Sequence, residues 1–156
     1  MPIVRIDIQA GKSTEYRRAI LHGVRDAVTQ ALGVPADRVT QRIIETPAEN
    51  IDATEVKSDR LTLIEVTMIS RPAEKKEALY RAIAKNLGIA PGISAHDLQV
   101  IVNDPPAECF FLNGEMASAV PAAPSTASAP VSTVPPVADG LDVATAKPAQ
   151  DADTEE

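Results

Sequence analysis

Residues 61–69 read Leu-Thr-Leu-Ile-Glu-Val-Thr-Met-Ile, which is the strongest strand pattern in the chain. Pro72 follows closely, and proline is favoured as the first residue of a helix because the N–H that it lacks has no partner there. Apolar residues then recur with the period of a helix. They are Ala78, Leu79, Ala82, Ile83 and Leu87. With a last strand predicted at Asp97–Val102, this half of the chain is expected to form a strand–helix–strand unit.

The first part of the chain has the same order. The alternation of a strand is present in Val4, Ile6 and Ile8 against Ile3, Arg5 and Asp7. A helix is predicted from Thr14 to Leu32, with Ser13 as its N-cap and Gly33 as its stop. Its apolar positions are Ile20, Val24, Ala27, Val28 and Ala31. The segment Val39–Thr46 is predicted to be the next strand.

The predicted order is therefore β-α-β followed by β-α-β, an α/β fold. Two architectures share this order: the ferredoxin-like split unit, and two tandem units in which the strands of each unit pair in parallel. They differ in strand order, and therefore in which strands are hydrogen-bonded neighbours. Secondary structure alone leaves both open.

The composition changes sharply after about residue 118. The segment Ala119–Glu156 consists largely of Ala, Pro, Ser, Thr and Val and has no aromatic residue, so it cannot bury enough apolar surface to order itself. It also carries most of the formal net charge of −7. We therefore predict a folded domain over residues 1–118, nearly neutral, and a disordered acidic tail over residues 119–156.

The composition also argues against several classes of protein. An acidic chain with a pI near 4.8 lacks the basic face that a nucleic-acid partner requires. No run approaches the roughly 18 apolar residues of a membrane span, and the start does not read as a signal peptide, so we expect a cytoplasmic protein. One cysteine, Cys109, and two histidines do not make a usual zinc cluster. We expect neither a metal nor a cofactor.

The chain begins Met1-Pro2, and methionine is normally removed before a residue as small as proline. Pro2 would then carry a free secondary amine, which can hold or release a proton. For general acid–base catalysis its pKa must approach the working pH, and burial beside cations lowers the pKa of an amine. By itself, a proline at this position is also compatible with an ordinary structural residue.

Several short motifs follow one another in a specific order. They read PIVRID at residues 2–7, GKS at 11–13, EYRRAI at 15–20, GVP at 33–35, DR at 37–38, SDR at 58–60, LIEVT at 63–67 and ALYRAI at 78–83. Over about residues 2 to 117 this order resembles the tautomerase superfamily, and in particular its longer bacterial members, which include malonate semialdehyde decarboxylase.

The resemblance implies a homotrimer of two-repeat subunits, with Pro2 in a pocket and arginines that bind the substrate carboxylate. Arg71 lies in a segment similar to the one that supplies this arginine in the decarboxylase, and a guanidinium matches the two oxygens of a carboxylate. A solvated arginine at a helix start is the alternative. Ala73 stands where the decarboxylase has a second arginine, which argues against decarboxylation.

Three further residues are candidates for the site. Asp37 is similar to the acidic residue that handles water in the decarboxylase, although it is also typical of a turn. Arg42 would bind an anion if its strand turns the side chain inward, which alternation leaves open. Phe110 stands near a position where the family often has tryptophan. It would wall the pocket, or else serve in core packing or a subunit contact.

We therefore predict a cofactor-free tautomerase of a small anionic 2-oxo acid, in which Pro2 is the general acid and base and Arg71 anchors the carboxylate. One alternative is a decarboxylase or hydratase of a short 3-oxo or unsaturated acid, with Asp37 directing water. Another is a non-catalytic ferredoxin-like binding module, in which Pro2 is incidental.

Overall fold

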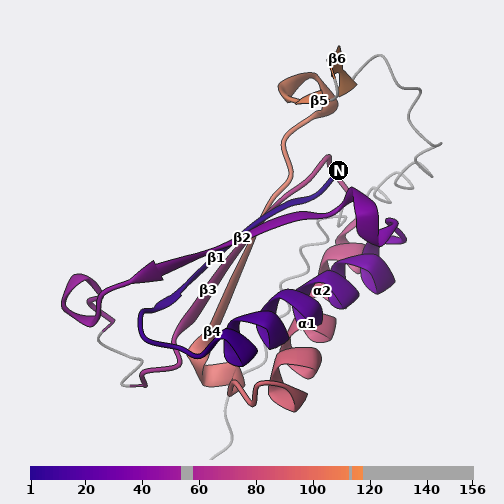
Figure 1. Cartoon of the computed structure of the whole chain (residues 1–156). Helices are drawn as coiled ribbons and strands as arrows, with labels where there is room; N and C mark the ends of the chain where they lie inside the picture. The colour runs from indigo at the N-terminus through magenta and orange to yellow at the C-terminus, as the bar shows by residue number, and fades with distance from the viewer. Residues whose placement is uncertain (54–57, 113, 118–156) are drawn as a thin grey trace, which may run out of the picture. The chain divides into compact units, whose positions relative to one another are not determined.

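A four-stranded sheet forms the centre of the computed structural model (Figure 1). The structure describes residues 1–53, 58–112 and 114–117, so the predicted tail lies outside the described residues. The strands of the sheet are β1 (Ile3–Gln9), β2 (Thr40–Thr46), β3 (Thr62–Thr67) and β4 (Leu98–Asn103). The two long helices are α1 (Thr14–Leu32) and α2 (Ala73–Ile89).

The strand order decides between the two architectures. The order is β2-β1-β3-β4, with β1 parallel to β2, β3 parallel to β4, and β1 antiparallel to β3. In a split unit another strand lies between the two strands of each β-α-β unit, whereas here those strands are hydrogen-bonded neighbours. The prediction of two tandem β-α-β units is confirmed. The ferredoxin-like alternative is wrong.

The helices begin and end where local chemistry favours it. Ser13 caps α1, since its hydroxyl oxygen accepts a hydrogen bond from the Tyr16 N–H at 3.1 Å. Gly33 ends α1 with φ at 67°, a conformation that glycine adopts at low cost. Pro72 precedes α2 in an extended conformation (ψ 151°) and is not its first residue as predicted, although its carbonyl accepts the first bonds of the helix.

The predicted strand at residues 61–69 is shorter in the structure. It spans Thr62–Thr67, and β4 begins one residue later than expected.

No helix in the described part of the chain is long and apolar enough to cross a membrane.

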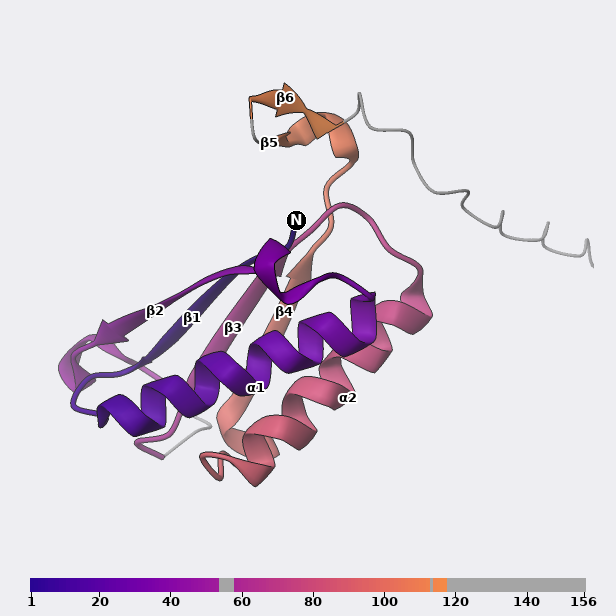
Figure 2. The same cartoon turned by 45° about the vertical axis from the view of Figure 1, so that its right-hand side comes forward.

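Both helices cover the same face of the sheet, as the turned view in Figure 2 shows. The core between them and the sheet contains fully buried residues from both helices and from the central strands β1 and β3. They include Val4, Ile6, Ile64, Val66, Ile20, Val24, Leu79, Ile83 and Leu87. The helices meet at Gly23, where a Cβ would lie 3.0 Å from Leu87 Cδ2. The Asn86 side-chain amide donates to the Gly23 carbonyl at 2.9 Å, which ties the helices together.

The opposite face of the sheet carries no helix among the described elements. Apolar side chains are exposed there: Ile3, Leu63 and Ile101 have exposed fractions of 39%, 37% and 56%. We call this surface the open face. Because parallel strand pairs are usually buried on both faces, a surface of this kind is suited to contact with another protein surface.

A small hairpin follows the sheet. It consists of β5 (Phe111–Leu112) and β6 (Glu115–Met116), with Gly114 in the turn at a φ of 88°. The Ala117 N–H donates to the Phe110 carbonyl at 2.9 Å and extends the pairing. The hairpin lies at the end of the sheet where the chain starts (Figure 1).

Replacing Ile64 by alanine tests the central position of β3. Ile64 is 1% exposed, so Ile64→Ala should lower the free energy of unfolding by about 2–5 kcal/mol through lost burial and a residual cavity. Ile89→Ala is the matched control, because Ile89 is 74% exposed and its loss should cost no more than about 0.5 kcal/mol. Urea denaturation measures both. Equal losses in the two variants would contradict the assigned core.

Candidate active site

The pairing of β1 brings distant segments to the start of the chain. Ile3 lies opposite Thr40 in the parallel ladder and opposite Thr67 in the antiparallel ladder. The residues that precede β2 and those that follow β3 therefore surround Met1 and Pro2. The first group forms the short 3-10 helix η1 (Ala36–Arg38), and the second includes Arg71.

Pro2 is buried and fixed by the backbone. Its carbonyl oxygen accepts a hydrogen bond from the Thr40 N–H at 3.1 Å, which extends the β1–β2 pairing to the end of the chain. Met1 is half-buried. The position of the N-terminus is thus set by the sheet and not by a loose segment.

A pocket of about 260 Å³ lies beside the N-terminus. Its lining residues are Met1, Arg38, Ile69, Leu112, Glu115, Met116 and Ala117. One guanidinium and one carboxylate are therefore combined with apolar side chains. The hairpin of β5 and β6 supplies Leu112 and Met116 to the apolar wall, and η1 supplies the guanidinium of Arg38.

The amine at the N-terminus is electrostatically perturbed. Burial lowers the pKa of the Met1 amine, and the positive charges of Arg71 and then Arg38 lower it further. Within the described ranges no salt bridge involves either arginine. An amine beside two guanidiniums is a favourable place for a small anion.

Arg71 and Arg38 both act on the N-terminal amine next to Pro2, but of the two only Arg38 lines the pocket, and Arg71 is exposed outside the lining. The other predicted site residues lie elsewhere. Asp37 is exposed in η1 and does not line the pocket. Arg42 lies opposite Arg5 on β2, with its side chain exposed, and does not line it either.

Phe110 is buried, with an exposed fraction of 6%, and is not among the lining residues. Leu112 and Met116 contribute the apolar wall in its place. Sequence reasoning missed these two residues and Glu115. The Asn-Gly step after Leu112 is a hairpin signal, and it indicates that residues on either side of the turn come together.

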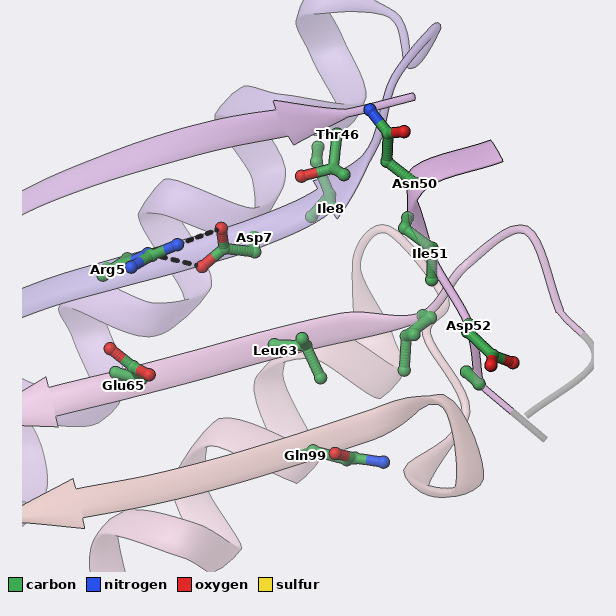
Figure 3. Close-up of a pocket in the computed structure, with 12 residues that line it drawn as sticks. Arg5, Asp7, Ile8, Thr46, Asn50, Ile51, Asp52, Leu63, Glu65 and Gln99 are labelled. Atoms are coloured by element: carbon green, nitrogen blue, oxygen red, sulfur yellow. Dashed lines mark hydrogen bonds and ion pairs between the residues drawn. The ribbon is translucent and has the colours of Figure 1, made fainter. Parts of the chain in front are cut away.

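A second, larger hollow of about 690 Å³ lies on the open face (Figure 3). Arg5 and Asp7 face one another there and form two hydrogen bonds of 2.8 and 2.9 Å. Glu65 and Asp52 add further negative charge. Because its one arginine is already paired with a carboxylate, this hollow is less suited to an anion than the pocket at the N-terminus.

The influence of the arginines on the N-terminal amine can be tested directly. Arg71→Ala should raise the pKa of the amine, because removal of a neighbouring positive charge makes protonation less costly, and Arg38→Ala should raise it less. The chemical shift of the N-terminal residue, followed by NMR across pH, measures this. Arg81→Ala is the control, since Arg81 is exposed on α2 and pairs with Glu77. A pKa in Arg71→Ala equal to that of the control would contradict the arrangement.

The chain is similar in sequence to known proteins over most of its described length. Two family profiles, both described as tautomerase enzyme, match residues 2–59 and 41–110. The probable tautomerase YrdN of Bacillus subtilis (strain 168) is 31% identical over 121 residues, which cover 74% of this chain and 94% of YrdN.

Solved structures share the fold. Pt0534 inactivated by 2-oxo-3-pentynoate has a TM-score of 0.70 at 26% identity, with 76% of this chain and 99% of that chain covered. The Q0 fused 4-OT symmetric trimer gives 0.68 at 28% identity, covering 75% and 97%. The FG41 malonate semialdehyde decarboxylase inhibited by 3-bromopropiolate gives 0.67 at 25% identity, covering 78% and 99%. As its sequence motifs indicate, this chain belongs to the tautomerase superfamily.

Proposed function

We propose that the protein is a cofactor-free tautomerase that interconverts the enol and keto forms of a 2-oxo acid, with Pro2 as its general acid and base. The observation that carries the proposal is the N-terminal amine beside Arg71 and Arg38, whose pKa is lowered by burial and then by the charges of these two arginines. Removal of Met1 moves the free amine one residue inward, to buried Pro2. A lowered pKa keeps more of the amine in its basic form near neutral pH.

The proposed reaction transfers one proton. The unprotonated Pro2 nitrogen accepts the proton of the enol hydroxyl, and the C2–O bond becomes a carbonyl. The electron pair of the C2–C3 double bond then takes the proton from the Pro2 ammonium at C3. The amine returns to its starting state, and neither an oxidant nor a second substrate is required.

Arg71 is proposed to anchor the substrate carboxylate, with Arg38 as a second cation. A charge-assisted contact of this kind contributes about 1.5–3 kcal/mol, and the planar guanidinium fixes the orientation of the carboxylate. The anion would also relieve the repulsion between the two arginines and the protonated amine. The positive charge of the site thus serves both binding and proton transfer.

We further propose that the protein assembles as a homotrimer through the open face. Two relatives of known structure, the Q0 and R7 fused 4-OT proteins, are described as trimers, at 28% and 26% identity. The exposed Ile3, Leu63 and Ile101 give this face the apolar surface that a subunit interface requires.

A decarboxylase or hydratase remains the second candidate, favoured by the likeness to the FG41 malonate semialdehyde decarboxylase. Two features of this chain count against it. Ala73 replaces the second arginine of the decarboxylase motif, and Asp37 is exposed outside the pocket lining. Product analysis separates the candidates, because a tautomerase releases no carbon dioxide and adds no water.

The role of Pro2 is tested by mass and by kinetics. Untagged active protein should lack one methionine in its intact mass, and Pro2→Ala should lower kcat/KM on the enol of phenylpyruvate by at least tenfold, since a primary amine on a flexible residue replaces a fixed secondary amine. Circular dichroism checks that the variant is folded. Active protein that retains Met1 in full would overturn the mechanism.

The proposed interface is tested on the open face. Ile101→Asp places a charge in the interface and should convert a trimer into single subunits, whereas Ile89→Asp on α2 should leave the mass unchanged. Ile89 is the stricter control because it is the more exposed of the two, at 74% against 56%. Analytical ultracentrifugation measures the masses. A wild type that sediments as one subunit argues against the assembly.

A further inference from the structure

Glu115 is the one acidic residue that lines the N-terminal pocket among the described residues. It lies on β6 and pairs with Leu112 of β5. The hydrogen bond from the Ala117 N–H to the Phe110 carbonyl, at 2.9 Å, closes the hairpin on its other side. The hairpin therefore holds a carboxylate at the wall of a pocket whose other charged groups are cationic.

This carboxylate is not neutralised by a neighbour in the part of the chain that the structure describes. None of the salt bridges there involves Glu115, and none involves Arg38 or Arg71. Among the described residues Glu115 and the pocket's guanidinium, that of Arg38, are therefore not paired with each other in a salt bridge, and both can act on a bound molecule. The guanidiniums attract an anionic group, and Glu115 repels one.

The walls of the pocket determine what the rest of a bound molecule meets. Met1 itself lines the pocket, so its removal under the proposed function opens the side next to Pro2 and leaves the other lining residues in place. A molecule whose carboxylate is held by Arg38, with the charge of Arg71 nearby but outside the lining, has the rest of its atoms against the remaining walls. Those walls are Ile69, Leu112, Met116, Ala117 and Glu115. An apolar group would be buried there, whereas a second carboxylate would lose water and meet a like charge.

We propose that Glu115 is a specificity-determining residue, which restricts the site to enols with one carboxylate and an uncharged, mainly apolar remainder and excludes dicarboxylates. The inference rests on the proposed function and adds the charge class of the substrate. Specificity of this kind depends on a repulsive element as well as on attractive contacts. Here the guanidinium attracts the carboxylate that both substrate classes share, whereas Glu115 repels the second carboxylate, which only a dicarboxylate has.

The test compares two enols that share the 2-oxo acid group. The enol of phenylpyruvate has one carboxylate and an aromatic body, and the enol of oxaloacetate has two carboxylates. Glu115→Gln keeps the shape of the side chain and removes its charge. It should raise kcat/KM on the oxaloacetate enol by about tenfold and change that on the phenylpyruvate enol less than twofold. Glu115→Lys should raise the ratio of kcat/KM on the oxaloacetate enol to kcat/KM on the phenylpyruvate enol further.

Glu108→Gln is the matched control, because Glu108 is exposed in the short helix η4 (Ala107–Cys109) and does not line the pocket. It should leave both values of kcat/KM unchanged. Added salt should weaken the discrimination of the wild type, since an exposed carboxylate is screened, and should have less effect on the ratio in Glu115→Gln.

The outcomes separate this inference from the proposed function. If the wild type converts the phenylpyruvate enol in a Pro2-dependent manner but Glu115→Gln and Glu115→Lys keep the wild-type ratio, Glu115 does not set specificity and the tautomerase function stands. If Pro2→Ala is as active as the wild type on both enols, the proposed function is wrong and the inference fails with it.

Discussion

The hydrogen bonding of β1 to two neighbours at once is the constraint on which the structure depends. β1 pairs in parallel with β2 and antiparallel with β3, so its first residues lie beside the start of one strand and the end of another. The segments around Arg38 and Arg71 are far apart in the sequence, and only this pairing joins them at the N-terminus. Because Val4 and Ile6 are fully buried, a shift of β1 by one residue would turn these side chains away from the core. The same shift would move the N-terminus away from the segments that contain Arg38 and Arg71.

Electrostatics gives this location its chemistry. Partial burial of the amine destabilises its protonated form and so lowers its pKa, and the charges of the two guanidiniums add to the effect. Bringing like charges together is unfavourable. The buried core offsets this, because it stabilises the sheet independently of the site. An anion that binds between the arginines would then be attracted by charges already in place, with little reorganisation of the protein.

The sequence predicted the elements well and the site only in part. Periodicity and capping residues located α1 exactly, because Ser13 and Gly33 are local signals. The order of the strands depends on contacts between residues that are distant in the sequence, so the sequence alone does not exclude the ferredoxin-like alternative. Arg71 follows a strand end that pairing brings to Pro2. Arg42 and Phe110 do not line the pocket, since the exposure of a side chain on β2 and the path of the last hairpin follow from packing that no local pattern encodes.

The two β-α-β units have the same order of elements but different charges at their ends. At the end of the sheet where β3 starts, the cation after β1 is Lys12, and it is paired with Asp59 at 2.8 Å. At the end where β1 starts, Arg71 has no salt-bridge partner among the described residues. The Met1 amine, whose pKa is lowered by burial and then by Arg71, precedes β1, whereas peptide nitrogens precede β3. Within the described residues, the repeated architecture therefore places a cation without a salt bridge beside a titratable amine where β1 starts, and a cation paired with a carboxylate where β3 starts.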